Sequence, residues 1–157
     1  AGVTGKQEEA NDLPAVERLA SRPWEFPDFI ANALGIAQWP GRYDAKFAFH
    51  RSCHSRGTET GKAVRTLLAS IGNAEVIPFG QQEQCCGFGG TFSVTFPHIS
   101  GQMGTLKLDK ILDAKPDLLC GIDMSCLMPL SGLATNQGRP VPHKHAIQIL
   151  RDTLKSA

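Results

Sequence analysis

Two adjacent cysteines are followed by a glycine-rich run in the segment Cys85-Cys86-Gly87-Phe88-Gly89-Gly90. Neighbouring side chains point in different directions along a strand or a helix. Two adjacent thiols therefore face one small object only where the backbone turns tightly around it, which glycine permits. The three glycines also leave backbone N–H groups uncrowded, so that they can point at sulfides or another anionic group. The segment predicts a loop that wraps a metal cluster.

The composition is that of an ordinary globular protein of one domain, with 157 residues of which 41% are hydrophobic and 20% charged. The net charge of +1 argues against nucleic acid or an anionic membrane surface as a partner. The apolar runs are too short for a direct membrane span, and no signal peptide opens the sequence. Five cysteines, an odd number, indicate metal ligation or thiol chemistry in a reducing compartment, and we expect a cytoplasmic location.

The chain divides into three expected parts. Residues 1–12 are polar and patternless, which predicts a flexible lead-in. Residues 13–42 predict a helical N-terminal segment with helices over 14–20 and 27–34, because each of these starts with proline in its first turn. Residues 43–157 form the third part. The first residue is alanine instead of methionine, so we expect either a fragment or a trimmed chain.

Strand and helix patterns alternate in the third part. Strands are predicted over residues 46–50, 74–79, 117–122 and 140–144, and helices over residues 58–70, 98–114, 127–135 and 146–154. In the helix over 98–114, Ile99, Met103, Leu106 and Ile111 have the spacing of one apolar face. The alternation favours a three-layer α/β fold with a four-stranded, mostly parallel sheet and helices on both faces.

Residues that could bind a metal follow each predicted strand. They are Cys53 after the first strand, Cys85 and Cys86 after the second, Cys126 after the third and His145 after the fourth. The carboxyl ends of parallel strands share one edge of a sheet, where ligands bind, so we expect these side chains to converge. Cys120 lies inside the third strand instead, and we expect it to be a buried core residue.

The cysteines lie in motifs similar to those of a known family. The motifs are His50-Arg51-Ser52-Cys53-His54, CCGFGGTFS over residues 85–93, Asp123-Met124-Ser125-Cys126-Leu127-Met128 and the closing His145-Ala146-Ile147. Together they resemble the cysteine-rich CCG domain of iron–sulfur oxidoreductases, in particular those of the lactate-utilisation type. The resemblance covers residues 14–157.

This resemblance implies an iron–sulfur cofactor and an electron-transfer role. The implied cluster is of the 4Fe–4S type, with Cys53, Cys85, Cys86 and Cys126 as ligands and Gly87, Gly89 and Gly90 in the binding loop. The implied function is that of a subunit passing electrons during oxidation of L-lactate to pyruvate, beside other iron–sulfur subunits. Proteins of this type carry two such domains, and the motifs match the second. We therefore expect the N-terminal half to be missing and the isolated domain not to oxidise lactate.

One position departs from the five-cysteine pattern found in part of the family. Asp123 stands where the first cysteine of a Cys-x-x-Cys pair would lie. It could bind iron through oxygen or cap the next helix, and we favour the cap because it is the commoner role of aspartate there. We expect Asp123, His54 and His145 to surround the ligands without binding metal, and His50 and His54 to hydrogen-bond loop carbonyls.

Two alternatives stay open on the sequence alone. Four thiolates could form a structural zinc site, although zinc-binding cysteine pairs usually have two to four residues between them. A thiol–disulfide enzyme with Cys85 or Cys86 as its nucleophile would instead be free of metal, and one of its thiols would react much faster than the others.

Overall fold

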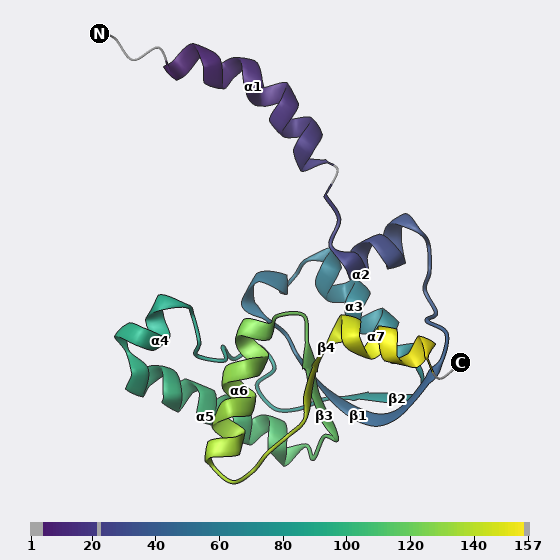
Figure 1. The fold of residues 1–157 in the computed structure, drawn as a ribbon, viewed down its shortest axis with the longest axis vertical. Helices are drawn as coiled ribbons and strands as arrows, with labels where there is room; N and C mark the ends of the chain where they lie inside the picture. The colour runs from purple at the N-terminus through teal and green to yellow at the C-terminus, as the bar shows by residue number, and fades with distance from the viewer. Residues whose placement is uncertain (1–4, 22, 156–157) are drawn as a thin grey trace.

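A computed structural model of the chain describes residues 5–21 and 23–155 (Figure 1). Its helices are α1 (Gly5–Ala20), α2 (Phe26–Asp28), α3 (Glu59–Ala69), α4 (Thr91–Thr95), α5 (Pro97–Asp113), α6 (Met124–Asn136) and α7 (Ala146–Leu154), with a π-helical turn η1 (Phe29–Ala33) and a 3-10 turn η2 (Cys53–Ser55). Its strands are β1 (Arg42–His50), β2 (Gly72–Ile77), β3 (Leu118–Gly121) and β4 (His143–His145). Helix α1 extends away from an α/β body that contains the other elements. No helix in the described ranges is both long and apolar enough to cross a membrane.

The four strands form one parallel sheet in the order β2-β1-β3-β4. This confirms the predicted four-stranded α/β sheet. The strand ends are aligned, because His50 at the end of β1 is paired with Gly121 at the end of β3, and Gly121 with His145 at the end of β4. The loops that follow these three strands therefore leave the sheet from the same edge.

Alternating side chains of the central strands contribute to separate cores on the two faces of the sheet. Phe47 and Phe49 of β1 pack in the core that includes residues of α3 and α7. Ala48 of β1 and Leu119 of β3 pack in the core that includes residues of α5 and α6. Each fully buried side chain of the size of Phe47 contributes about 1.5–3 kcal/mol through the hydrophobic effect. The two cores make the three layers that the sequence predicts.

Three helices begin at side chains that accept hydrogen bonds from their first turns. Thr58 caps α3, where its Oγ1 accepts from the N–H of Gly61 at 3.1 Å. Asp123 caps α6. His145 caps α7 and forms a reciprocal capping box with Gln148, whose Oε1 accepts from the backbone N–H of His145 at 2.8 Å. Helix α7 has the bounds that the sequence predicts, Ala146–Leu154.

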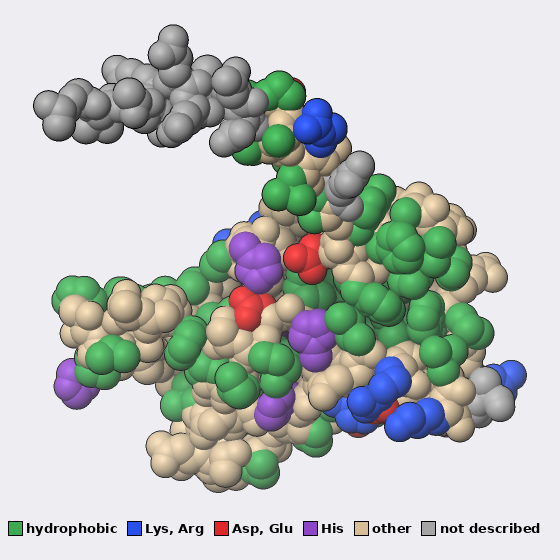
Figure 2. Space-filling model, turned by 45° about the horizontal axis from the view of Figure 1, so that its top comes forward, with side chains coloured by type: hydrophobic (Ala, Val, Ile, Leu, Met, Phe, Trp, Pro, Cys, Tyr) green, Lys and Arg blue, Asp and Glu red, His purple; other side chains and the backbone are tan. Residues whose placement is uncertain are grey.

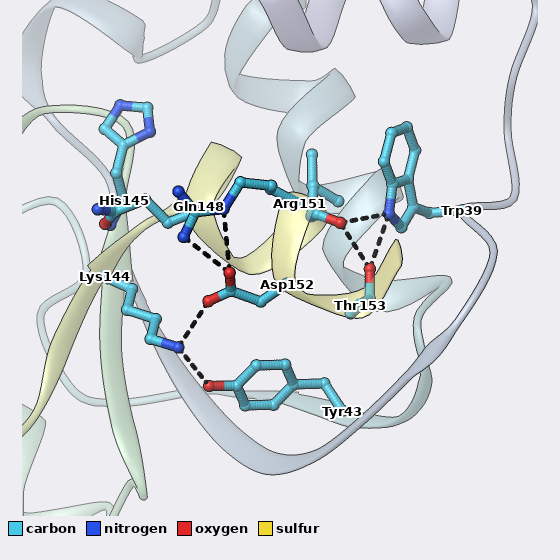
Figure 3. A network of polar contacts seen from close by, with 9 residues as sticks. Trp39, Tyr43, Lys144, His145, Gln148, Arg151, Asp152 and Thr153 are labelled. Atoms are coloured by element: carbon cyan, nitrogen blue, oxygen red, sulfur yellow. Dashed lines mark hydrogen bonds and ion pairs between the residues drawn. The ribbon is translucent and has the colours of Figure 1, made fainter. Parts of the chain in front are cut away.

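Polar contacts connect α7 to strands β1 and β4 (Figure 3). The ammonium of Lys144 on β4 donates to the hydroxyl of Tyr43 on β1 at 3.0 Å and to Asp152 on α7 at 2.8 Å. The indole N–H of Trp39 lies 3.0 Å from the carbonyl oxygen of Leu150 and 2.9 Å from Oγ1 of Thr153, both on α7. These contacts hold the last helix against the sheet.

The structure differs from the sequence prediction near the N-terminus. Helix α1 begins at Gly5 and continues through Pro14, so residues 5–12 of the expected lead-in are helical. Residues 1–4 lie outside the described part of the chain. The helix expected over 27–34 consists of α2 followed by η1. The division of the chain into three parts stays a prediction.

Strands β1 and β2 both begin earlier than predicted. The first half of β1 alternates between exposed and half-buried side chains, so it lacks the apolar run that marks the second half. Strand β2 begins at Gly72 and passes through Asn73, whose φ is +63°. The pairing of the two strands shifts between Arg42 and Ala45. The sequence Gly72-Asn73 is typical of a turn. In the structure these two residues lie in the strand, at the irregularity in its pairing.

The buried face of α5 is not the face that the apolar spacing predicts. Ile99 and Leu106 are exposed, whereas Gly104, Lys107 and Leu108 are buried together with Ile111. Only part of the predicted stripe, including Ile111, therefore faces the core. The physical reason is that α5 packs against the loop containing Cys86 and Gly87, which needs the small Gly104 and the long Lys107 on that side.

Candidate metal centre

The four cysteines that follow strands in the sequence meet at the carboxyl edge of the sheet. Cys53 opens η2 after β1, and Cys126 lies in the first turn of α6 after β3. Cys53 lies near enough to Cys85, and Cys126 to Cys86, to affect the pKa of its neighbour's thiol. The two pairs also influence each other, since Cys53 acts electrostatically on Cys126 and Cys86 on Cys85. These interactions agree with the expected convergence, and the role of the four thiols as ligands stays a prediction.

Three ligand atoms form a buried group inside this site. The side-chain ligand atoms of His50, Cys86 and Cys126 all lie within 4.8 Å of one another. These residues are 2%, 5% and 8% exposed, so the group is shielded from water. Such a set of nitrogen and sulfur donors could hold a metal ion.

His50 has a different role from the one that its position in the sequence predicts. Neither of its ring nitrogens has a hydrogen-bond partner among the described residues, although both are buried. The expected hydrogen bonds from His50 to loop carbonyls are therefore wrong. A buried imidazole without partners is energetically costly, and a ligand at the sulfurs of Cys86 and Cys126 would remove this cost. The sequence contained one indication of a role at the site, because His50 is a polar residue at the end of an apolar strand, three positions before Cys53.

The pKa values of the two buried thiols, Cys86 and Cys126, are shifted in opposite directions. A hydrogen bond from the Cys126 thiol lowers the pKa of Cys86 well below its usual range, against the opposing effect of burial, and His50 lowers it further. The same interaction, together with burial, raises the pKa of Cys126. The interaction thus favours loss of the proton from Cys86 over loss of the proton from Cys126. Burial also raises the pKa of the half-buried Cys85, against a hydrogen bond from the backbone of Gly87.

The glycine loop bends tightly around the cysteines. Gly87, Gly89 and Gly90 have φ angles of +86°, +54° and +57°, a region that other residues rarely adopt. The N–H of Gly87 points at the sulfur of Cys85, 3.4 Å away. The loop thus directs a backbone donor at one of the four sulfurs, as expected for a site that binds an anionic group.

Asp123 acts as a helix cap. Its Oδ1 accepts hydrogen bonds from the backbone N–H of Ser125 at 2.8 Å and from the Ser125 hydroxyl at 2.6 Å. Its other oxygen, Oδ2, lies 3.4 Å from Nδ1 of His54, which is largely exposed. Burial alone would raise the pKa of Asp123, but the hydrogen bonds from Ser125 and the charge of His54 lower it. The cap that we favoured from the sequence is present.

Both ring nitrogens of His145 form hydrogen bonds with backbone groups. Its Nδ1 accepts from the N–H of Ile147 at 3.2 Å, and its Nε2 lies 2.9 Å from the carbonyl oxygen of Ile122. Because Nδ1 is the acceptor, Nε2 carries the proton and donates to Ile122. His145 therefore holds the segment just before Asp123, so it can position the site without ligating a metal.

Cys120 lies apart from the other thiols. It is fully buried in the core with Phe49, on the face of the sheet covered by α3 and α7. Cys86 and Cys126 belong to the core on the opposite face. The expectation that Cys120 is a core residue is confirmed.

Two hollows lead to the neighbourhood of the site. A cavity of about 330 Å³ between α5 and α6 is lined by Cys86, Phe88 and small residues that include Gly104. A second hollow of about 470 Å³ is lined by polar residues that include Glu25, His54 and Asp123. Figure 2 shows histidine and acidic side chains grouped near the middle of one face of the domain. The hollow that reaches Cys86 is thus mainly apolar, whereas the hollow beside Asp123 is mainly polar.

The sequence is similar to that of known proteins. A family model described as "Cysteine-rich domain" (CCG) matches residues 47–131. Lactate utilization protein A of Exiguobacterium sp. is 35% identical over 145 residues, which are 92% of this chain and 59% of that protein. Lactate utilization protein A of Shouchella clausii is 38% identical over 135 residues, or 85% of this chain and 56% of the relative. Uncharacterized protein YkgE of Escherichia coli is 34% identical over 134 residues, again 85% and 56%.

The chain spans somewhat more than half the length of these relatives. The region matched by the family model contains the thiols that converge in the structure: Cys53, Cys85, Cys86 and Cys126. It also contains β2, β3 and the second half of β1, and it exceeds half of the chain. On this evidence, the chain belongs to the CCG cysteine-rich domain family.

Proposed function

We propose that this domain binds an iron–sulfur cluster of the 4Fe–4S type through Cys53, Cys85, Cys86 and Cys126 and transfers electrons. The observation that carries the proposal is the meeting of four thiols, from three separate segments, beside a buried histidine that has no hydrogen-bond partner among the described residues. Thiolates are the preferred ligands of iron–sulfur centres, and the donor set therefore fits such a cluster.

The residues of the chain have distinct tasks in this proposal. The four thiolates would hold the cluster, which supplies one-electron transfer when it is bound. The N–H of Gly87, already directed at the sulfur of Cys85, would stabilise negative charge there, and Gly89 and Gly90 would keep the loop free of side chains. Asp123 and His145 would fix the ends of β3 and β4 beside the ligands.

The physiological role that fits best is an electron-transfer subunit of a lactate-utilisation system. Two of the relatives are named lactate utilization protein A, which supports this assignment. Oxidation of L-lactate to pyruvate releases two electrons and two protons, and the domain would pass those electrons onward. Other iron–sulfur subunits and a further, N-terminal CCG half would be its partners, so the isolated domain would not oxidise lactate. The free thiols fit the reducing cytoplasm.

Anaerobic purification followed by iron and sulfide analysis tests the cluster. We expect a brown protein with about four irons and four sulfides per chain. Serine in place of Cys53, Cys85, Cys86 or Cys126 should remove most of this iron. Cys120→Ala is the matched control, because it removes a thiol from the opposite core, and it should retain the cluster. A colourless wild-type protein without iron after anaerobic reconstitution would refute the proposal.

Zinc is the second candidate. It is favoured by one observation, that a nitrogen of His50 and the sulfurs of Cys86 and Cys126 lie within 4.8 Å of one another, since zinc commonly takes mixed nitrogen and sulfur ligands. This site would contain a histidine in place of the all-cysteine set that the sequence suggested. One zinc per colourless chain, lost in His50→Ala but kept in Cys53→Ser, would establish zinc over the cluster.

A further inference from the structure

Lys107 is a fully buried lysine beneath the cysteine loop. Its side chain lies on α5 with 0% exposure. The ammonium donates to the carbonyl oxygens of Gln81 and Gln82 at 3.1 and 2.8 Å. It also lies 4.8 Å from the centre of the Phe79 ring, at a distance typical of a cation–π contact. All three contacted residues lie between β2 and the Cys85-Cys86 pair.

The contacted carbonyl of Gln81 closes the turn that leads to the cysteines. It accepts a hydrogen bond from the N–H of Gln84 at 2.9 Å as well as the one from Lys107. Gln81 itself has a φ of +54°, which is unfavourable for a residue with a side chain. A strained turn needs support from its surroundings, and Lys107 provides two hydrogen bonds to it.

The opposite side of the same turn is held by ion pairs. Glu83 pairs with Arg51 and with Arg56, whose Nε lies 3.2 Å from Oε2 of Glu83. Arg51 and Arg56 lie on either side of Cys53 in the sequence. Glu83 therefore connects the segment that carries Cys53 to the turn before Cys85, while Lys107 supports that turn from within the protein.

A buried charge has an energetic cost that the surroundings of Lys107 offset only partly. Burial and the charge of Arg56 lower the pKa of Lys107 to about 8, whereas Glu83, Cys86 and Cys53 act in the opposite direction. The ammonium thus remains charged in most molecules at neutral pH. Additional negative charge on the sulfurs would stabilise the charged form of Lys107. In the same way, the Lys107 ammonium would stabilise an anionic group bound at the cysteines.

We propose that Lys107 is a positioning residue which fixes the Gln81–Gln84 turn, so that Cys85 and Cys86 face the site, and which raises the reduction potential of the bound cluster. The second part rests on the proposed iron–sulfur function. Reduction adds a negative charge to the cluster, and a fixed cation nearby stabilises the reduced form more than the oxidised form.

The test compares Lys107→Met with Lys110→Met. Methionine has a similar length but neither the charge nor the donor, and Lys110 lies on the same helix with its ammonium in an ion pair with Asp113, 3.7 Å away. In metal-free protein, Lys107→Met should speed amide hydrogen exchange of residues 81–87 about tenfold or more, while residues of the sheet stay protected. In reconstituted protein, its midpoint potential should shift to more negative values. Lys110→Met should change neither quantity.

Each measurement can overturn its own part of the proposal. Unchanged exchange of residues 81–87 in Lys107→Met would refute positioning, even if the wild-type chain bound no cluster. An unchanged potential in a fully loaded Lys107→Met would refute the electrostatic part. Failure of the wild-type chain to take up iron and sulfide would instead refute the proposed function. If Lys107→Met does not fold, Lys107→Gln, which keeps a neutral donor, should show the same shift in potential with a smaller change in exchange.

Discussion

Gly87 lies so close to Ser100 that a β-carbon built on the glycine would be 2.5 Å from the Ser100 carbonyl oxygen. The two residues also share a hydrogen bond, in which the Ser100 hydroxyl donates to the carbonyl oxygen of Gly87 at 2.8 Å. The cysteine loop is thus fixed directly onto helix α5. A side chain at position 87 would push the two apart, and Cys86 would move with the loop.

Gly87→Ala should therefore destabilise the protein and prevent cluster assembly. We expect its free energy of unfolding to fall by about 2–5 kcal/mol, from the left-handed φ and the steric clash together. Gly138→Ala is the control, since Gly138 also has a left-handed φ of +68° but nothing within 4 Å of its would-be β-carbon. This control should lose only about 1 kcal/mol and keep its cluster. Chemical denaturation and iron analysis measure both, and equal losses in the two variants would contradict the steric argument.

Asp123→Asn should leave both stability and iron content close to wild type, because asparagine is also a good N-cap. Asp123→Ala should lower the free energy of unfolding of the metal-free protein by about 1 kcal/mol, through loss of the hydrogen bonds from Ser125. Thermal unfolding without metal and iron analysis after reconstitution provide the two readouts. Loss of iron from Asp123→Asn at an unchanged melting temperature would instead make Asp123 a metal ligand.

Cys120 should be inert toward alkylation in the folded, metal-free protein. It is fully buried, and burial raises the pKa of its thiol, so the reactive thiolate is scarce. Iodoacetamide labelling followed by mass spectrometry should show modification of the exposed Cys53 in native protein, and of Cys120 only at the rate of unfolding. Rapid native-state labelling of Cys120 would show that the sheet opens locally around β3.

Asp152 should contribute to stability above about pH 4 and lose this contribution in acid. A hydrogen bond from Lys144, and then one from Arg151, lower the pKa of Asp152 from 3.8 to about 2. The unfolded state therefore binds more protons between these values, and stability falls as the pH drops through them. The difference in melting temperature between wild type and Asp152→Asn should be larger at pH 7 than at pH 2. Lys144→Met should reduce that difference at pH 7, and an equal difference at both pH values would contradict the prediction.

Elements with strong local signals could be predicted from the sequence. Helix α7 has its predicted bounds, Ala146–Leu154. Helix α5 begins at Pro97, which supplies the expected first helical position. The meeting of Cys53, Cys85, Cys86 and Cys126 followed from the rule that the ends of parallel strands share an edge. This prediction depends only on the order of strands and helices along the chain, so errors of a few residues in their bounds do not affect it.

Features that depend on tertiary contacts could not be predicted in the same way. The burial of Lys107 depends on hydrogen bonds to the carbonyl oxygens of Gln81 and Gln82, which are distant in sequence. His50 was expected to hydrogen-bond to a loop carbonyl, because the sequence does not show that its ring faces the thiols of Cys86 and Cys126. The short helix α4 follows Gly90 and has no side-chain cap, so it lacked a recognisable start. The structure at these positions depends on contacts with residues that are distant in sequence.

The strand order has a consequence for synthesis of the chain on the ribosome. Strand β1 lies between β2 and β3, but β3 begins only at Leu118. While residues 78–117 are being translated, β1 can pair with β2 alone, and its other edge exposes unpaired backbone groups beside Phe47 and Phe49. Such an edge is a template for aggregation. This edge of β1 therefore stays open until β3, and with it the last thiol of the site, has been made.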